Sequence, residues 1–134
     1  MKYFSHKVRT NDGEFDSTAE YRRYQELKLE ERGGYIWGLR KQVRFQILPQ
    51  ILVTIYKQLK TKVKEIVRVD EQAKHYTCDF CYYDVAEKVY VIEEVKSYAT
   101  AKARDYPLRK HLIKQIINRH NSKGRSVWTF REVK

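Results

Sequence analysis

Hydrophobic and polar residues repeat with two different periods along the chain, and the first long segment has the period of a helix. Ser17 and Glu20 fit a capping box at its start, and Gly33-Gly34 supplies its end. At about 100° per residue, Glu20 and Leu27 lie on one stripe, so we expect the carboxylate of Glu20 to face a sheet. Asn11-Asp12-Gly13, just upstream, is typical of a turn.

The middle of the chain has the alternation of strands. We predict extended structure over residues 35–37 and 42–48, and two further strands at about residues 75–84 and 89–96. Residues 51–69 mix β-branched side chains with lysines. They fit either a strand pair or an insertion of mixed structure.

A second helix and a last strand complete the pattern. A polar link, residues 97–105, leads to a helix with Pro107 near its start and Gly124 just past its end, and residues 126–130 form a short strand. The order is α-β-β-β-α-β, and the last strand can join the sheet in parallel after the helical crossover. We therefore expect an α/β fold, a mixed β-sheet flanked by helices, in one domain spanning residues 1–134. The basic segment 50–70 is a candidate insertion in this core.

The composition of the chain indicates what kind of partner the protein binds. The 134 residues carry 28 Lys and Arg against 17 Asp and Glu, a net charge of +11. Such charge favours nucleic acid as the partner, although a ribosome-associated or membrane-surface protein would also be basic. No run approaches the ~20 apolar residues that span a bilayer, and the first residues lack an apolar signal segment. We expect a cytoplasmic protein with no membrane partner.

The two cysteines raise the question of a metal or redox site. Cys78 and Cys81 form a C-x-x-C motif, with His75 upstream. On a strand, positions three apart point to opposite faces, and a structural zinc site needs four ligands. We expect two buried, reduced thiols.

An acidic residue on one strand and Glu-x-Lys on the next are typical of a metal-dependent phosphodiesterase. Residues two apart on a strand share a face, so Glu94 and Lys96 emerge together. A short turn makes the two strands antiparallel neighbours, which brings Asp79 close to Glu94. Two carboxylates and an amine form a site for a hard metal and a phosphate.

Each of these residues also has an ordinary structural explanation. Glu20 could serve only as the capping partner of Ser17. Glu94 and Lys96 could form a surface ion pair of little energetic value. Asp79 lies in an apolar run, where an unpaired carboxylate is costly, and this favours a functional role. Glu93 points to the other face and is not expected to bind the metal.

Several motifs in order resemble the PD-(D/E)xK nuclease superfamily and, more narrowly, small phage and prophage proteins similar to Holliday junction resolvases. The resemblance covers about residues 10 to 130. It rests on Asp12-Gly13-Glu14-Phe15-Asp16-Ser17-Thr18-Ala19-Glu20-Tyr21-Arg22-Arg23-Tyr24, on Gln42 to Phe45, on Asp79-Phe80 and on Glu94-Val95-Lys96. Cys78 stands where the superfamily usually has proline, and Ser97 where glycine often follows the lysine.

The resemblance implies a restriction-endonuclease-like fold and a site for Mg²⁺ or Mn²⁺. The implied catalytic residues are Glu20, Asp79, Glu94 and Lys96, and the implied metal ligands are Asp79, Glu94, Glu20 and the Val95 carbonyl. The implied products are a 5′-phosphate and a 3′-hydroxyl.

We expect the substrate to be DNA and a set of basic and polar residues to contact it. These residues are Arg22, Arg23, Arg40, Lys41, Gln42, Arg44, Lys102, Arg104, Arg109 and Lys110. A basic enzyme without a target-recognition domain fits branched DNA, cut by a homodimer, better than sequence-specific restriction. The alternatives are a duplex-specific or nicking nuclease, a transposase-type end-cutting subunit, and a non-catalytic DNA-binding recombination accessory protein.

Overall fold

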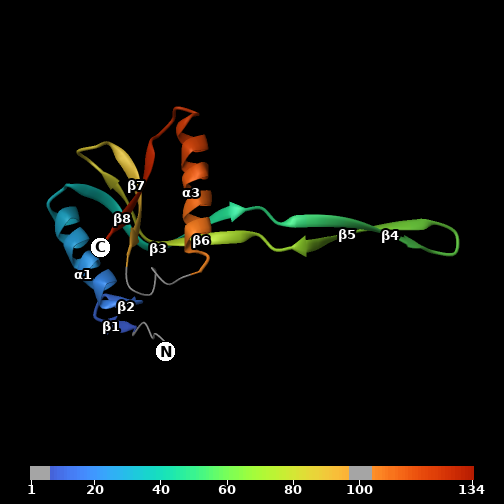
Figure 1. Cartoon of the computed structure of the whole chain (residues 1–134), viewed down its shortest axis with the longest axis horizontal. Helices are drawn as coiled ribbons and strands as arrows, with labels where there is room; N and C mark the ends of the chain where they lie inside the picture. Colours follow the sequence, from blue (N-terminus) through green and yellow to red (C-terminus); the bar gives the residue numbers. More distant parts are fainter. Residues whose placement is uncertain (1–6, 97–103) are drawn as a thin grey trace.

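The computed structural model describes residues 7–96 and 104–134 and has a four-stranded mixed sheet at its centre (Figure 1). The strand order is β3 (Ile36–Leu48), β6 (Lys74–Asp84), β7 (Val89–Val95) and β8 (Trp128–Val133). The first three strands are antiparallel neighbours, and β8 lies parallel to β7. The expected α/β fold, with a mixed sheet whose last strand is parallel, is confirmed.

Two helices, α1 (Thr18–Arg32) and α3 (Tyr106–Asn121), cover opposite faces of this sheet (Figure 1). Leu27 of α1 packs in a buried cluster with Phe80 on one face. On the other face, Ile113 of α3 packs with Ile92. Neither helix is long and apolar enough to cross a membrane.

The start of α1 follows the predicted capping pattern. The Ser17 hydroxyl accepts a hydrogen bond from the Glu20 amide at 3.1 Å, which satisfies one of the free amides of the first turn. Glu20 and Leu27 are both buried, so the predicted stripe does face the sheet.

The strands differ from the expected ones in extent. The two extended segments near residue 40 are one strand, β3, which contains an irregularity between Trp37 and Arg40 where Gly38 has a φ of 65°. The last strand begins at Trp128, two residues later than predicted. The turn at residues 11–13 connects a small hairpin, β1 (Val8–Thr10) and β2 (Gly13–Phe15).

Residues 51–69 form a strand pair, which decides between the two alternatives left open by the sequence. Strands β4 (Ile51–Gln58) and β5 (Val63–Glu71) pair with each other and extend away from the sheet as an arm (Figure 1). Residues that face each other across an antiparallel pair share a face. One face of the arm therefore carries five exposed apolar side chains, Leu52, Tyr56, Val63, Val67 and Val69, together with the polar Thr54, Gln58 and Glu65.

The two cysteines are buried and unpaired, as expected, but they do not point to opposite faces. Cys78 and Cys81 both pack in the cluster under α3, whereas Phe80 packs under α1. The alternation of β6 therefore breaks around Asp79. The partner strand is irregular at the same place, because Gln42 has a φ of 55°.

One buried ion pair holds α1 against the sheet. The Arg23 guanidinium donates to both oxygens of Glu93, from Nε at 2.8 Å and from Nη2 at 2.9 Å, and the Tyr82 hydroxyl donates to Glu93 at 2.6 Å. The Glu93 side chain is fully buried. Its hydrogen bonds and its opposite charge offset the loss of water around the carboxylate.

Replacing one partner of this pair is expected to destabilise the fold strongly. Arg23→Ala should lower the free energy of unfolding by about 3–5 kcal/mol, because the Glu93 charge then stays buried without a cation. The adjacent Arg22 is exposed and provides the control; Arg22→Ala should change stability by no more than about 0.5 kcal/mol. Urea unfolding of both variants measures this difference, and equal stabilities would contradict the role given to Arg23.

Candidate active site

Strand β7 carries two consecutive buried glutamates that point to opposite faces of the sheet. Glu93 faces α1 and is neutralised there by Arg23, so it is not available as a metal ligand. Glu94 faces the side of α3, where the Tyr76 hydroxyl donates to its Oε2 at 2.5 Å. Burial, and then the charge of Glu20, raises the pKa of Glu94 to about 7.

Asp79 of β6 lies close to the end of β7. Its Oδ2 accepts a hydrogen bond from the Val95 amide at 2.7 Å, which ties the carboxylate to the strand that carries Glu94. Burial, followed by the charges of Glu94 and Glu20, raises the pKa of Asp79 to about 8. The one interaction with β7 that favours the ionised form is the hydrogen bond from Val95.

Glu20 reaches the same region from the first turn of α1. Its Oε1 accepts a hydrogen bond from the Gln42 side-chain amide at 2.7 Å, and its Oε2 accepts one from the Asp16 amide at 3.3 Å. Burial, followed by the charge of Asp16, raises the pKa of Glu20, and the charge of Lys41 lowers it. The Glu20 carboxylate therefore accepts hydrogen bonds both from β3 and from the segment just before α1.

The structure thus brings together three carboxylates that lie far apart in the sequence. Glu20 and Glu94 each raise the pKa of Asp79, and Glu20 raises the pKa of Glu94. Like charges that shift one another's pKa in a partly buried place are typical of functional sites. Strand geometry predicted that Asp79 approaches Glu94, the helix stripe predicted that Glu20 faces the sheet, and the family resemblance implied that Glu20 joins the other two carboxylates.

The donor chemistry of this carboxylate group fits a hard divalent cation, which takes oxygen ligands and offsets negative charge. Over residues 7–96 and 104–134, however, no three His, Cys, Asp or Glu side chains are arranged to hold a metal ion directly. The oxygens of Glu20, Asp79 and Glu94 accept hydrogen bonds from neighbouring groups instead. Val95 takes part through its amide, and the role expected for its carbonyl stays a prediction.

Lys96 follows β7 directly, and its amine lies beside a different carboxylate. Its Nζ is 3.3 Å from Oε2 of Glu132, which pairs with Glu94 in the parallel register of β7 and β8. Lys110 of α3 binds the other oxygen of Glu132. The expected catalytic amine is therefore next to the carboxylate group but forms its ion pair with Glu132.

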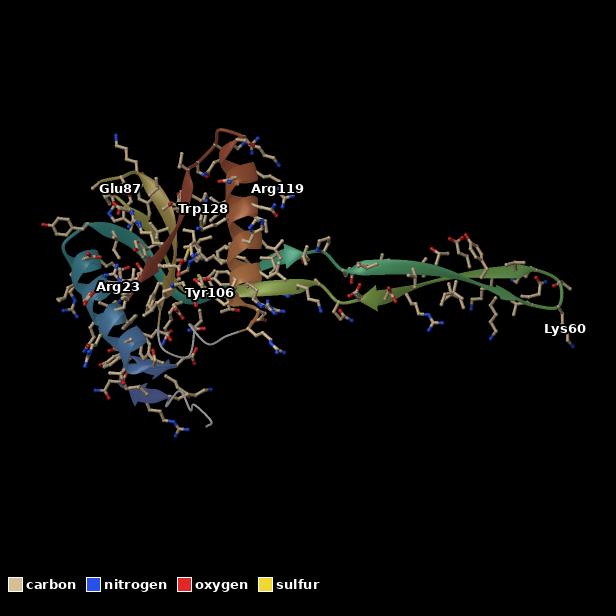
Figure 2. The ribbon with its side chains drawn as sticks, in the orientation of Figure 1. Arg23, Lys60, Glu87, Tyr106, Arg119 and Trp128 are labelled. Atoms are coloured by element: carbon tan, nitrogen blue, oxygen red, sulfur yellow. The ribbon has the colours of Figure 1, made fainter. Side chains whose placement is uncertain are left out.

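Several residues of this region were not found from the sequence. Glu132 adds negative charge next to Glu94 and raises its pKa. Tyr106 lies at the start of α3 (Figure 2). Burial of its hydroxyl, followed by the charges of Glu132, Glu94 and Asp79, raises the pKa of Tyr106. Asp16, just before the N-cap Ser17, is a further charged neighbour, and its charge raises the pKa of Glu20.

Of the residues on α1 and β3 that we expect to contact DNA, some are exposed and others are bound to neighbouring groups of the protein. Arg22 and Arg40 are exposed, whereas Arg23 binds Glu93. Lys41 lies 4.4 Å from the centre of the Phe15 ring, and its amine donates to a backbone carbonyl of the β1–β2 turn. Gln42 holds Glu20.

The other expected contacts lie near α3. Arg44 meets Nδ1 of His75 at 2.9 Å, and Arg109 bonds both Asp105 and the His75 carbonyl. Lys110 binds Glu132, Arg104 is exposed, and Lys102 lies outside the described residues.

Comparison with known proteins places the chain in one family. Its residues 1–134 match the model of a family described as "Protein of unknown function (DUF1064)". No curated protein and no solved structure matches the chain. Because the match spans the whole printed sequence, the chain belongs to the DUF1064 family.

Proposed function

We propose that this protein is a metal-dependent endodeoxyribonuclease that hydrolyses phosphodiester bonds in DNA. The observation that carries the proposal is the group formed by Glu20, Asp79 and Glu94, three partly or fully buried carboxylates whose pKa values are all raised. The charges of Glu20 and Glu94 contribute to the raised pKa of Asp79, and the charge of Glu20 contributes to that of Glu94. A carboxylate group of this kind has little structural use without a cation, because it destabilises the folded protein at neutral pH.

Asp79, Glu94 and the Val95 carbonyl would hold Mg²⁺ or Mn²⁺, and Glu20 would hold a second ion or a bound water. The ion supplies an acidified water and neutralises charge on the phosphate. Tyr76 and Gln42 orient the carboxylates of Glu94 and Glu20 through the hydrogen bonds they donate.

Lys96 would stabilise the negative charge that develops on the phosphorus centre. To do so, the Lys96 amine must leave Glu132 and bind the substrate phosphate. Glu132 would then still be paired with Lys110. We therefore expect Glu132 to hold Lys96 close to the site while DNA is absent.

The order of elements supports the same proposal. Without the two hairpins, the chain runs α1, β3, β6, β7, α3, β8. This is the α-β-β-β-α-β order of the restriction-endonuclease-like core that the motifs resemble. Asp79, Glu94 and Lys96 lie on or just after the second and third of its strands.

The net charge of +11 supports DNA as the substrate. Within that class we propose branched DNA, of the Holliday junction type, cut in recombination or DNA processing by a phage-type homodimer with two sites. A second candidate is a DNA-binding accessory protein without catalysis. The ion pair of Lys96 with Glu132 favours this candidate, because it occupies the amine that a nuclease would use.

A cleavage assay separates the two candidates. With Mg²⁺ or Mn²⁺, the protein should cut a four-way junction faster than a duplex of the same sequence, and EDTA should abolish cutting. Asp79→Asn and Glu94→Gln should each lower the rate at least about 100-fold, because both remove a ligand charge. Glu87→Gln, at an exposed turn, is the control. Binding without any cutting would favour the accessory protein.

The raised pKa values predict a dependence of stability on pH. Asp79 titrates near pH 8 in the folded protein but near its ordinary 3.8 when unfolded. Between these two values the unfolded chain loses the proton first, so stability falls as pH rises from about 4 to 8. Asp79→Asn should remove this loss and stabilise the protein at pH 8 by at least about 1.4 kcal/mol, the equivalent of one pKa unit. At pH 4 the two proteins should unfold alike in urea.

Metal binding should appear as stabilisation even without substrate. At pH 8, millimolar Mg²⁺ or Mn²⁺ should raise the melting temperature of the wild type, since a ligand of the folded state stabilises it. Asp79→Asn should lose this response. Lys96→Met should keep the response but lower the cleavage rate about 100-fold. Loss of the metal response in Lys96→Met would contradict the separate roles given to the amine and the carboxylates.

A further inference from the structure

At the end of the central strands away from Asp79 and Glu94, one aromatic side chain from each strand joins a continuous row. Trp37, Tyr83, Tyr90 and Trp128 face each other in the strand registers, so all four lie on the α3 face. Ring centres are 5.6 Å apart for Trp37–Tyr83, 4.9 Å for Tyr83–Tyr90 and 4.9 Å for Tyr90–Trp128. In Figure 2, Trp128 and Glu87 of the β6–β7 turn lie above Tyr106, which is at the lower end of α3.

Part of this row is open to solvent. Trp37 is 60% exposed and Tyr90 is 39% exposed, whereas Trp128 packs against the core and α3. The exposed part lines a hollow of about 830 Å³, and Gly38, Tyr83 and Ser126 line it as well. This volume is in the range of sites that bind organic ligands.

Three basic side chains line the same hollow, each from a different connection or bulge. They are Arg40 of the irregular part of β3, Lys88 of the β6–β7 turn and Arg125 of the segment between α3 and β8. None of the three forms an ion pair with a residue of the described ranges. The acids nearest the turn, Asp84 and Glu87, both bind Arg131.

The bulge in β3 explains why aromatic and basic groups meet here. Trp37 and Arg40 are three residues apart and would face opposite sides of a regular strand. Because the register shifts between them at Gly38, Trp37 pairs with Tyr83 and Arg40 with Cys81, which share one face. The bulge therefore brings a guanidinium beside an exposed indole.

We propose that this hollow binds unpaired nucleotides of a DNA strand, with bases stacked on Trp37 and Tyr90 and phosphates held by Arg40, Lys88 and Arg125. Aromatic faces stack with any base, and basic groups track the phosphates, which together bind single strands without sequence preference. The inference rests on the proposed function and narrows its substrate to DNA with single-stranded parts. Tyr90 and Glu94 are four residues apart on β7, about 13 Å, so one strand can reach both sites.

Fluorescence titration in EDTA tests the hollow without cleavage. The protein has two tryptophans, and both belong to the aromatic row. Binding of oligo(dT) should quench their emission at 150 mM salt. Trp37→Ala and Tyr90→Ala should each weaken binding about tenfold, the value of roughly one stacked base. The same two substitutions should change the affinity for a blunt duplex less than twofold.

Two further variants guard against a change in folding. Trp37→Phe keeps an aromatic face and should bind nearly as well as the wild type, while much of the quenching disappears. Tyr35→Ala removes an aromatic side chain that is 70% exposed and lies outside the row, and it should bind like the wild type. Equal losses in Tyr35→Ala and Trp37→Ala, or no loss in Trp37→Ala, would overturn the inference.

Other outcomes separate this inference from the proposed nuclease. If the wild type cuts DNA but Trp37→Ala binds and cuts every substrate equally well, the hollow has no such role and the nuclease stands. If nothing is cut but oligo(dT) binding depends on Trp37, the proposal that the hollow binds a DNA strand is supported and the proposed nuclease activity is wrong. If dTMP binds as tightly as oligo(dT), the hollow is a site for a free nucleotide, and the proposal that it binds a DNA strand is wrong.

Discussion

The burial of two consecutive glutamates on opposite faces of one strand is the constraint on which the rest of this structure depends. Glu93 is neutralised by Arg23, and this pair fixes α1 to the sheet. Glu20 precedes Arg23 on α1 by three residues, close to one helical turn. The ion pair that positions the helix therefore also positions the carboxylate of Glu20 near Asp79 and Glu94.

The two glutamates differ in how their charge is balanced. Glu93 meets a guanidinium and a hydroxyl, so its ionised form suits the folded state. Glu94 meets a hydroxyl and further carboxylates, and its pKa rises to about 7. One strand thus provides a stabilising contact on one face and, in the proposed enzyme, an ion-binding carboxylate on the other.

Periodicity and capping residues were sufficient to predict the helices, the order of the core elements and the approach of Asp79 to Glu94. The helix stripe predicted that Glu20 faces the sheet, and its place beside the other two carboxylates was implied by the resemblance to PD-(D/E)xK nucleases. The neighbours of this group could not be predicted in the same way. Glu132 lies beyond residues 126–130, the extent predicted for the last strand, and its place next to Glu94 depends on the register between β7 and β8. The shared face of Cys78 and Cys81 depends on a break in β6 opposite Gln42, and glutamine does not signal a left-handed backbone.

The arm is built so that its length is independent of the rest of the fold. Leu48 pairs with Lys74 at the end of the sheet, and Ile51 pairs with Glu71 at the base of the arm, so a single ribbon runs through both. Adding or deleting opposed residues near the tip, one on each strand, would leave these basal pairs unchanged. A longer or shorter ribbon would accordingly change the reach of the arm and leave the geometry around Asp79 and Glu94 unchanged.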